Sequence, residues 1–262
     1  MKNVRTYGKS PYTVMLVHGG PGAPGEMRPV ALELSSKYGV LEPLQTANTI
    51  HGQIEELKSV IETIGNPPVT LVGWSWGAWL SLLTTAQHPS LVKKLILVSS
   101  GPFRAEYAKK IMPRRLSRLS REDRLRAEEL LNMIQTEDGV SDNDLQKFGS
   151  FMSKADSYNY LPETDKDEGL PVQMDIYQSI WKEAEELRKS GELLEYGKKI
   201  TCPVTVIHGI YDSHPYEGIK GPLSEVIKNC TFHLLDKCGH HPWLEKEARD
   251  KFFHVLEEEI EQ

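Results

Sequence analysis

The chain has 262 residues, which suffices for one large domain or two small ones. Apolar residues make up 39% of it and charged residues 26%, the balance of an ordinary globular protein, which excludes the disordered and membrane classes. A formal net charge of -6 does not favour nucleic acid, which requires a clustered basic surface. We therefore expect neither a nucleic-acid partner nor a membrane partner.

The cysteines and the N-terminal segment bear on the cellular compartment. Cys202, Cys230 and Cys238 form neither a CxxC pair nor a zinc pattern, which indicates free thiols in a reducing compartment. Near the N-terminus the longest apolar run covers residues 14–17 and is too short for a signal peptide or a membrane span. We expect a cytoplasmic protein.

The first part of the chain alternates between strand and helix patterns. Residues 12–17 are β-branched and apolar and stop at a glycine-rich segment, residues 18–22, which predicts a buried strand that ends in a loop. Residues 38–44 predict a short strand. Isoleucine and leucine then recur at steps of three and four between residues 50 and 64, which predicts an amphipathic helix ending at Gly65.

The same alternation continues through apolar segments. Residues 69–72 predict a buried strand, and the nearly all-apolar segment after Ser75 predicts a buried helix. Further strands are expected at residues 95–98, 204–207 and 231–235, and a closing helix at residues 243–260. Near-continuous apolar strands that alternate with helices indicate an α/β fold with a mostly parallel sheet covered on both faces.

The alternation is interrupted between the strand at residues 95–98 and the one at residues 204–207. The intervening segment is polar and helical, with capping patterns at Ser120 with Asp123 and at Ser141 with Asp144. Because a structureless loop of this length is implausible in a compact domain, we expect a core of residues 1–101 and 199–262 and a small helical cap of residues 102–198.

A basic stretch lies near the start of the expected cap. Its charges are expected to form a solvated helical face, with an acidic substrate or partner as the alternative. The stretch between Arg104 and Arg126 includes Lys109, Lys110, Arg114, Arg115, Arg118, Arg121 and Arg124. Aromatic residues of the cap are expected to fill its core, with an apolar substrate pocket as the alternative. These are Tyr107, Phe148, Phe151, Tyr177 and Trp181.

Residues 73–77, GWSWG, match the G-x-S-x-G pattern of a nucleophilic serine and lie between a predicted buried strand and a buried helix. A sharp strand-to-helix turn lifts the serine hydroxyl above the sheet, and it leaves no room for a Cβ at the flanking glycines. The amides at the start of the following helix point toward a developing anion. This placement predicts Ser75 as the nucleophile.

A serine needs a general base, and the base needs an acid partner. His240 and His241 follow the last predicted strand, and we favour His240 because it directly follows a glycine, with His241 as the second candidate. Asp212 follows the strand at residues 204–207 and is the preferred acid, with Asp236 as an outside alternative. The chain order of serine, acid and histidine fits this choice.

The oxyanion hole requires backbone N–H groups aimed at the carbonyl oxygen as it becomes negative. We expect one from Trp76 and one from Gly20, because the following Pro21 has no N–H. The alternative for the glycine-rich segment is a tight turn without a catalytic role, and His18 is expected to anchor that loop. Trp74 is expected to face the substrate pocket.

Together these segments resemble the α/β-hydrolase superfamily through five features: HGGPG, GWSWG, HGIYD, CGHHPW and the cap-sized insertion. The resemblance implies an eight-stranded, mostly parallel sheet, a Ser-Asp-His triad and a cap that closes over the substrate after the sixth strand. The sequence departs from the family at its start, because little precedes Tyr12 and the first strands are expected to be short or absent.

Within the superfamily the core motifs are similar to the prolyl aminopeptidase branch. That resemblance implies acidic cap residues that hold a free substrate amine, for which Glu106 and Glu163 are examples of candidates. The cap is small for that branch, so we rank an ester or amide hydrolase first and a prolyl-type aminopeptidase second. A ligand-binding or signalling protein on the same fold is the alternative from another class. We expect a small-molecule or short-peptide substrate, no cofactor and no metal.

Overall fold

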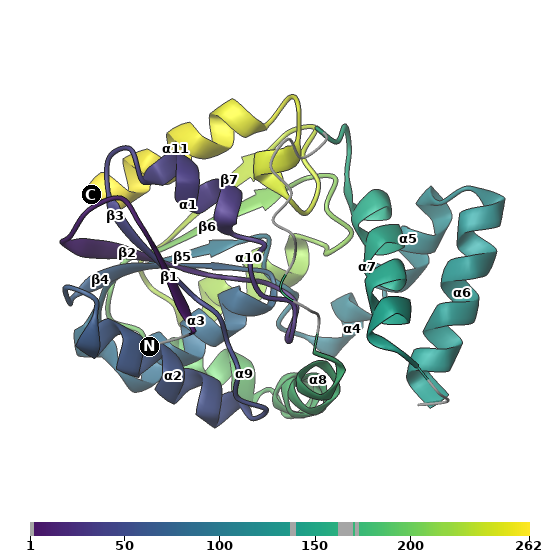
Figure 1. Cartoon of the computed structure of the whole chain (residues 1–262), viewed down its shortest axis with the longest axis horizontal. Coiled ribbons are helices and arrows are strands. Elements are labelled where there is room, and N and C mark those ends of the chain that lie inside the picture. The colour runs from purple at the N-terminus through teal and green to yellow at the C-terminus, as the bar shows by residue number, and fades with distance from the viewer. Residues whose placement is uncertain (1–2, 137–139, 162–169, 171–172) are drawn as a thin grey trace.

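A computed structural model of the chain describes residues 3–136, 140–161, 170 and 173–262. Its centre is a seven-stranded sheet with the strand order β1-β3-β2-β4-β5-β6-β7 (Figure 1). The strands are β1 Val4–Tyr7, β2 Tyr12–Val17, β3 Gly39–Pro43, β4 Val69–Trp74, β5 Val92–Val98, β6 Val204–Gly209 and β7 Cys230–Leu235. Only the edge strand β1 is antiparallel to its neighbour; the other pairings are parallel. The sheet is therefore of the mostly parallel type that the sequence predicts.

Helices cover both faces of the sheet, as a parallel sheet with two apolar faces requires (Figure 1). Along β5, Leu95 and Leu97 point to one apolar cluster and Ile96 and Val98 to the other. The core helices are α1 Arg28–Leu34, α2 Ile50–Thr63, α3 Trp76–Gln87, α10 Glu217–Val226 and α11 Arg249–Glu261, with 3-10 turns η1 Pro89–Leu91 and η3 Pro242–Leu244. Helices α1 and α11 pack on one face, and α2, α3 and α10 on the other.

The strand count differs from the eight strands that the family resemblance implies. One strand, β1, precedes β2 in the described part of the chain. The helical insertion therefore follows β5, the fifth strand along the chain, rather than the sixth. The sequence did not predict β1, α1 or α10.

The insertion between β5 and β6 contains six described helices and one 3-10 turn. These are α4 Ala105–Ala108, α5 Ile111–Arg118, α6 Arg121–Thr136, α7 Asp142–Asp156, α8 Met174–Ser190, α9 Glu192–Glu195 and η2 Tyr196–Lys199. Ser141 and Asp144 form the capping box predicted at the start of α7. Helices α5 to α7 share a small apolar cluster of their own, whereas α8 and α9 contribute to the cluster on the α2 and α3 face of the sheet.

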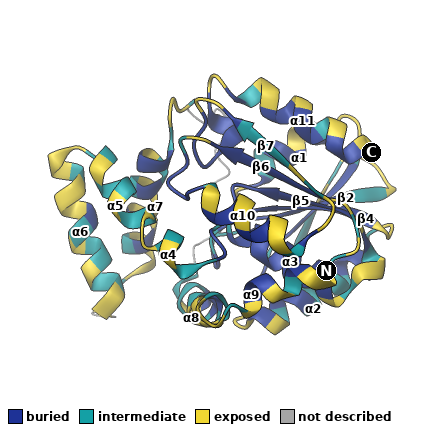
Figure 2. Ribbon diagram, turned by 180° about the vertical axis from the view of Figure 1, so that it is seen from behind, coloured by how far each residue is buried: buried dark blue, intermediate teal, exposed yellow. Residues whose placement is uncertain are grey.

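Burial separates the sheet from the outer insertion (Figure 2). The central strands are buried along nearly their whole length, while α6 carries many exposed residues. The basic stretch is only in part the solvated face that the sequence suggests, because the Arg115 and Arg118 side chains turn inward and bind groups near the sheet edge. No described helix combines the length and the apolar character needed to cross a membrane.

Candidate active site

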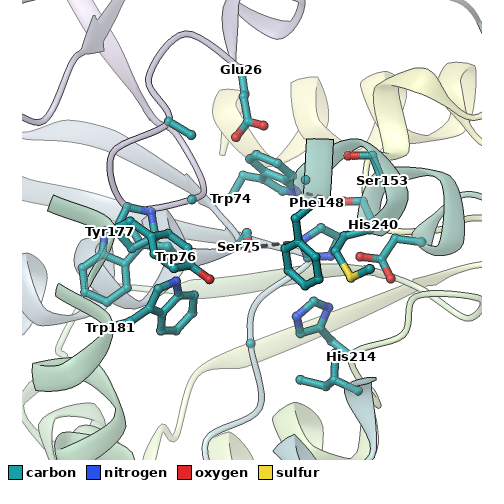
Figure 3. A pocket seen from close by; sticks show the side chains of 18 of the residues that line it. Glu26, Trp74, Ser75, Trp76, Phe148, Ser153, Tyr177, Trp181, His214 and His240 are labelled. Carbon is teal, nitrogen blue, oxygen red and sulfur yellow. Dashed lines mark hydrogen bonds between the residues drawn. The ribbon is translucent and has the colours of Figure 1, made fainter. Parts of the chain in front are cut away.

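Ser75 lies in the turn between β4 and α3, with a backbone φ of 55° and ψ of -115°. A Cβ on Gly73 would lie 2.2 Å from the carbonyl oxygen of Gly77, and a Cβ on Gly77 would lie 2.3 Å from the carbonyl oxygen of Val17. Neither distance leaves room for a side chain, so glycine is required on both sides of the serine. The turn places Ser75 at the carboxyl end of β4, in the wall of a cavity (Figure 3).

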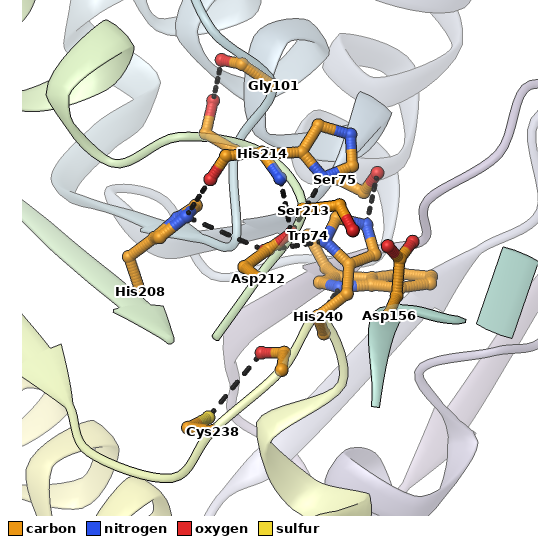
Figure 4. A network of polar contacts seen from close by, with 12 residues as sticks. Trp74, Ser75, Gly101, Asp156, His208, Asp212, Ser213, His214, Cys238 and His240 are labelled. Atoms are coloured by element: carbon orange, nitrogen blue, oxygen red, sulfur yellow. Dashed lines mark hydrogen bonds and ion pairs between the residues drawn. The ribbon is translucent and has the colours of Figure 1, made fainter. Parts of the chain in front are cut away.

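Ser75, His240 and Asp212 form one line of hydrogen bonds, although they come from three separate loops (Figure 4). The His240 Nε2 lies 3.0 Å from the Ser75 Oγ, and its Nδ1 lies 2.7 Å from the Asp212 Oδ2. Asp212 follows β6, and His240 follows β7. Asp236, the alternative acid, is exposed, and it is Asp212 that binds the imidazole.

The charges in this line favour a basic histidine. Burial opposes the charged form of His240, but the charge and hydrogen bond of Asp212 outweigh it and raise the His240 pKa above its ordinary value. Burial likewise opposes the Asp212 carboxylate, yet the neighbouring imidazoles, His240 first, hold the pKa of Asp212 well below its usual range. Asp212 is thus an anion that stabilises a proton on His240.

His241, the second candidate for the base, also lines the cavity but has a different environment. Its ring lies 4.6 Å from that of Trp74, centroid to centroid, and 5.6 Å from that of Trp243. Burial, followed by the charge of His240, lowers the His241 pKa to about 3. The residue that the structure brings to Ser75 is His240, and His241 is neutral near pH 7.

The two residues expected to form an oxyanion hole, Gly20 and Trp76, line the same cavity as Ser75. Trp76 is the first residue of α3, so its N–H has no acceptor within the helix. The glycine-rich loop is held at both ends: the His18 Nε2 accepts the Gln45 N–H over 3.3 Å, and the Gly22 carbonyl accepts the Gln173 N–H over 2.7 Å. The His18 ring thus anchors the loop, as the sequence suggests.

Trp74 lines the cavity, and it also supports the histidine loop. Its indole Nε1–H donates to the carbonyl oxygen of His240 over 2.8 Å. The Trp74 ring lies against those of His240, at 5.3 Å, and Trp243, at 5.2 Å. The contact with the cavity was expected from the sequence, whereas the support of the loop was not.

The cavity has a volume of about 600 Å³ and lies between the sheet edge and the insertion. Three of the five aromatic residues expected in the core of the insertion line it instead: Phe148, Tyr177 and Trp181 (Figure 3). Phe148 also packs with Phe151 in the cluster of α5 to α7, and Tyr107 packs against Gly218 of α10. The aromatic side chains give the cavity a largely apolar wall.

Acidic residues line the cavity at positions that the sequence did not single out. The described ones are Glu26, Asp156 and Glu185. Glu106 is exposed on α4 and is absent from the cavity wall, and Glu163 lies outside the described residues. Asp156 is buried and ion-paired with the Arg115 guanidinium, whose Nε lies 2.9 Å from the Asp156 Oδ2. No local motif connects these two residues, which are 41 positions apart.

His214 is a further site residue that the motifs did not reveal. Both its N–H and its Nδ1 lie within hydrogen-bond distance of the Asp212 Oδ1, at 2.9 and 2.8 Å. Its ring stacks on that of His240 with the centroids 4.4 Å apart. A histidine two residues after the expected acid was the available signal, because a turn that follows an aspartate commonly folds back onto its carboxylate.

Asp212, His214 and His240 present ligand atoms within 4.8 Å of one another, a spacing that a metal ion can span. The Nδ1 atoms of both histidines are, however, turned to the Asp212 carboxylate in hydrogen bonds. A metal would have to displace both hydrogen bonds, so the donor set fits a proton relay better than a metal centre.

Comparison with known proteins places this geometry in a family. A sequence profile described as "alpha/beta hydrolase fold" matches residues 35–247. A proline iminopeptidase of Lactobacillus helveticus (strain DPC 4571) is 24% identical over 276 residues, which cover 95% of this chain and 90% of that protein.

Solved structures agree with the sequence match at the level of the fold. The structure of VinJ has a TM-score of 0.71 at 17% identity, covering 98% of this chain and 94% of its own. A proline iminopeptidase of Mycobacterium smegmatis has a TM-score of 0.64 at 16% identity, covering 99% and 94%. The chain belongs to the α/β-hydrolase fold family, an enzyme family whose members act on small substrates.

Proposed function

We propose that this chain is a serine hydrolase that cleaves a carboxylic ester or amide through an acyl-enzyme on Ser75. The observation that carries the proposal is the unbroken line from the Ser75 Oγ through His240 to Asp212, with distances of 3.0 and 2.7 Å. Such a line makes a weak nucleophile reactive, because the imidazole takes the hydroxyl proton as the oxygen attacks.

In the proposed mechanism the Ser75 Oγ bonds to the substrate carbonyl carbon, and its proton passes to the His240 Nε2. The carbonyl oxygen becomes an anion that the N–H groups of Gly20 and Trp76 stabilise. The bond to the leaving group then breaks with its electron pair on the leaving atom, which takes the proton from His240. Water repeats the sequence on the acyl-enzyme and releases the acid.

We also propose that the insertion acts as the cap over the substrate. Supporting this role, Phe148, Tyr177 and Trp181 of α7 and α8 line the same cavity as Ser75. The three rings offer an apolar surface for the acyl or leaving group, while the sheet loops supply the reactive groups.

A fluorophosphonate probe and a short-chain p-nitrophenyl ester test the proposal together. We expect labelling at Ser75 and many turnovers per chain, with both lost in Ser75→Ala. Ser153→Ala is the matched control, because Ser153 lines the same cavity without a contact to His240, and this variant is expected to keep the label. Labelling that survives Ser75→Ala would refute the mechanism, and binding without turnover would favour the ligand-binding or signalling alternative.

A prolyl-type aminopeptidase is the second candidate. It is supported by the relationship to a proline iminopeptidase over 95% of this chain and by the carboxylates of Glu26 and Glu185 in the cavity wall. Asp156 fits an amine site less well, because it is buried and held at short distance by the Arg115 guanidinium. Glu185 also has cationic partners, Arg188 at 3.7 Å and Lys189 at 3.3 Å, but its side chain is half exposed, which weakens these pairs.

Proline arylamides with a free and with an acylated amine distinguish this candidate. An aminopeptidase prefers the free amine, and Glu185→Gln would reduce that preference about tenfold, since a charged hydrogen bond contributes roughly 1.5–3 kcal/mol. Glu186→Gln is the matched control, because Glu186 is the next residue on α8 and lies outside the cavity wall. Equal rates on the two arylamides would reject the aminopeptidase hypothesis but would not contradict the proposed ester or amide hydrolase.

A further inference from the structure

The protonation of His214 follows from its hydrogen bonds. Asp212 is held as a carboxylate and can only accept, so the hydrogen between it and the His214 Nδ1 belongs to His214. Burial lowers the His214 pKa to about 4, so the ring is neutral near pH 7. A neutral imidazole with its hydrogen on Nδ1 has an unprotonated Nε2, which is an acceptor.

The His214 ring is placed beside the reacting groups. His214 lines the cavity together with Ser75 and His240, and Figure 3 shows its ring directed toward His240. The two imidazoles are nearly parallel, with an angle of 21° between their planes, and both turn Nδ1 to the same carboxylate. Their Nε2 atoms therefore lie on the ring edges away from Asp212. The His240 Nε2 exchanges a proton with Ser75 in the mechanism proposed above, whereas the His214 Nε2 has no role in it.

Amides and esters differ in whether the leaving atom carries a hydrogen that needs an acceptor. When an acyl–nitrogen bond breaks, its electron pair goes to the nitrogen, which takes the proton from the His240 Nε2. The nitrogen of a secondary amide already carries one hydrogen, which points to one side of the lone pair that faces His240, whereas the oxygen of an ester carries none. An acceptor beside His240 satisfies that hydrogen, and a buried N–H without a partner is costly.

We propose that the His214 Nε2 accepts a hydrogen bond from the N–H of the scissile amide, so that the site is built for secondary amides rather than esters. The inference rests on the proposed serine mechanism and specifies its leaving group. His214 thereby has two contacts: Nδ1–H orients Asp212, which affects every substrate, and Nε2 affects only substrates that carry the N–H.

The test compares a p-nitroanilide and a p-nitrophenyl ester of the same short acyl group. The value of kcat/KM reports acylation, the step in which the leaving group departs. In His214→Ala we expect kcat/KM to fall for both substrates, because Asp212 loses a donor, and the ratio of amide to ester to fall about tenfold further. His214→Phe keeps a ring against His240 and serves as a second variant if alanine prevents folding.

Ser213→Ala is the matched control. Ser213 is the preceding residue on the loop, binds Arg118 and lies outside the cavity wall, so its loss is expected to leave the ratio of amide to ester unchanged. A proportional loss on both substrates in the His214 variants would overturn the proposal and reduce His214 to a positioning residue for Asp212. Failure of the probe to label Ser75 would instead remove the serine mechanism, and this inference with it.

Discussion

Ser75 occupies a backbone conformation that non-glycine residues rarely adopt. Its φ of 55° places the Cβ against the backbone, and strain of this kind costs on the order of 1–3 kcal/mol. The surrounding contacts maintain it, because β4 and α3 are buried on both sides of the turn. The hydroxyl is thus presented to His240 at the expense of stability.

A comparison of Ser75→Gly with Ser75→Ala measures the backbone strain at this position independently of the lost hydroxyl. Ser75→Gly and Ser75→Ala both remove the hydroxyl, but only glycine relaxes at a positive φ. We expect the glycine variant to be about 1 kcal/mol more stable than the alanine variant. Urea unfolding of the two variants measures the difference, and equal midpoints would show that the turn is not strained.

At the scale of elements, helix α5 connects the insertion to the loops of the site. Arg115 pairs with Asp156 at the end of α7, and the Arg118 guanidinium donates to the Ser213 Oγ over 2.9 Å. Arg118 also lies over the Tyr211 ring, 3.8 Å from its centroid. A helix that would otherwise be a solvated basic face thus contacts both the acid loop and the surroundings of His240.

The charge of Asp156 is expected to influence the pKa of His240, the proposed base. Asp156 raises the pKa of His240 and Arg115 lowers it, so Asp156→Asn leaves an unbalanced guanidinium that remains charged. In the proposed mechanism kcat/KM requires neutral His240, so we expect the acid limb of its pH profile to move to lower pH by about one unit. The variant should also be about 3–5 kcal/mol less stable, since an ion is left buried without its partner.

A pH–rate profile of Asp156→Asn, of Arg115→Met/Asp156→Asn and of Asp123→Asn provides the check. The double variant should return the acid limb toward that of the wild type. Asp123 is a partly exposed carboxylate of the same insertion that pairs with Lys154, so its loss should leave the limb in place. A limb that does not move in Asp156→Asn would show that Asp156 acts only on stability.

On the scale of the whole molecule, the sequence predicts what depends on local patterns. Apolar runs locate the central strands, and GWSWG locates Ser75, because strand, turn and helix are adjacent along the chain. The line from Asp212 to His240 was also accessible, since each residue directly follows a predicted strand. The ion pair of Arg115 with Asp156 was not, because it depends on how the insertion packs, and no periodicity encodes that.

Buried neutral histidines are expected to make the fold acid-sensitive. Burial lowers the pKa of His18 and of His214 to about 4, and that of His241 to about 3. Above the pKa of a histidine in the unfolded chain, about 6.5, neither the folded nor the unfolded chain binds these protons. Below it the unfolded chain binds them and the folded chain does not, so the free energy of unfolding falls with pH down to about pH 4. His240, with its raised pKa, opposes the loss as a single group.

Thermal unfolding between pH 7 and pH 4.5 measures this dependence. We expect a loss on the order of several kcal/mol, since each unit of pKa shift corresponds to about 1.4 kcal/mol per group. Four described histidines have a lowered pKa, the fourth being His208. His18→Gln should therefore reduce the pH dependence that they cause by roughly one quarter. His254→Gln is the control, because 71% of the His254 side chain is exposed. A slope that His18→Gln does not change would contradict the assignment.

The contact of the insertion with the histidine loop also constrains protein engineering. The Asp156 carbonyl accepts the His240 N–H over 2.9 Å, and a Cβ on Gly239 would lie 1.9 Å from that same oxygen. The contact joins two main chains, so an alignment of side chains does not reveal it. A chimaera that takes its insertion from a relative must therefore preserve a carbonyl at this point, whichever residue supplies it, if the grafted insertion is to keep the His240 imidazole in place.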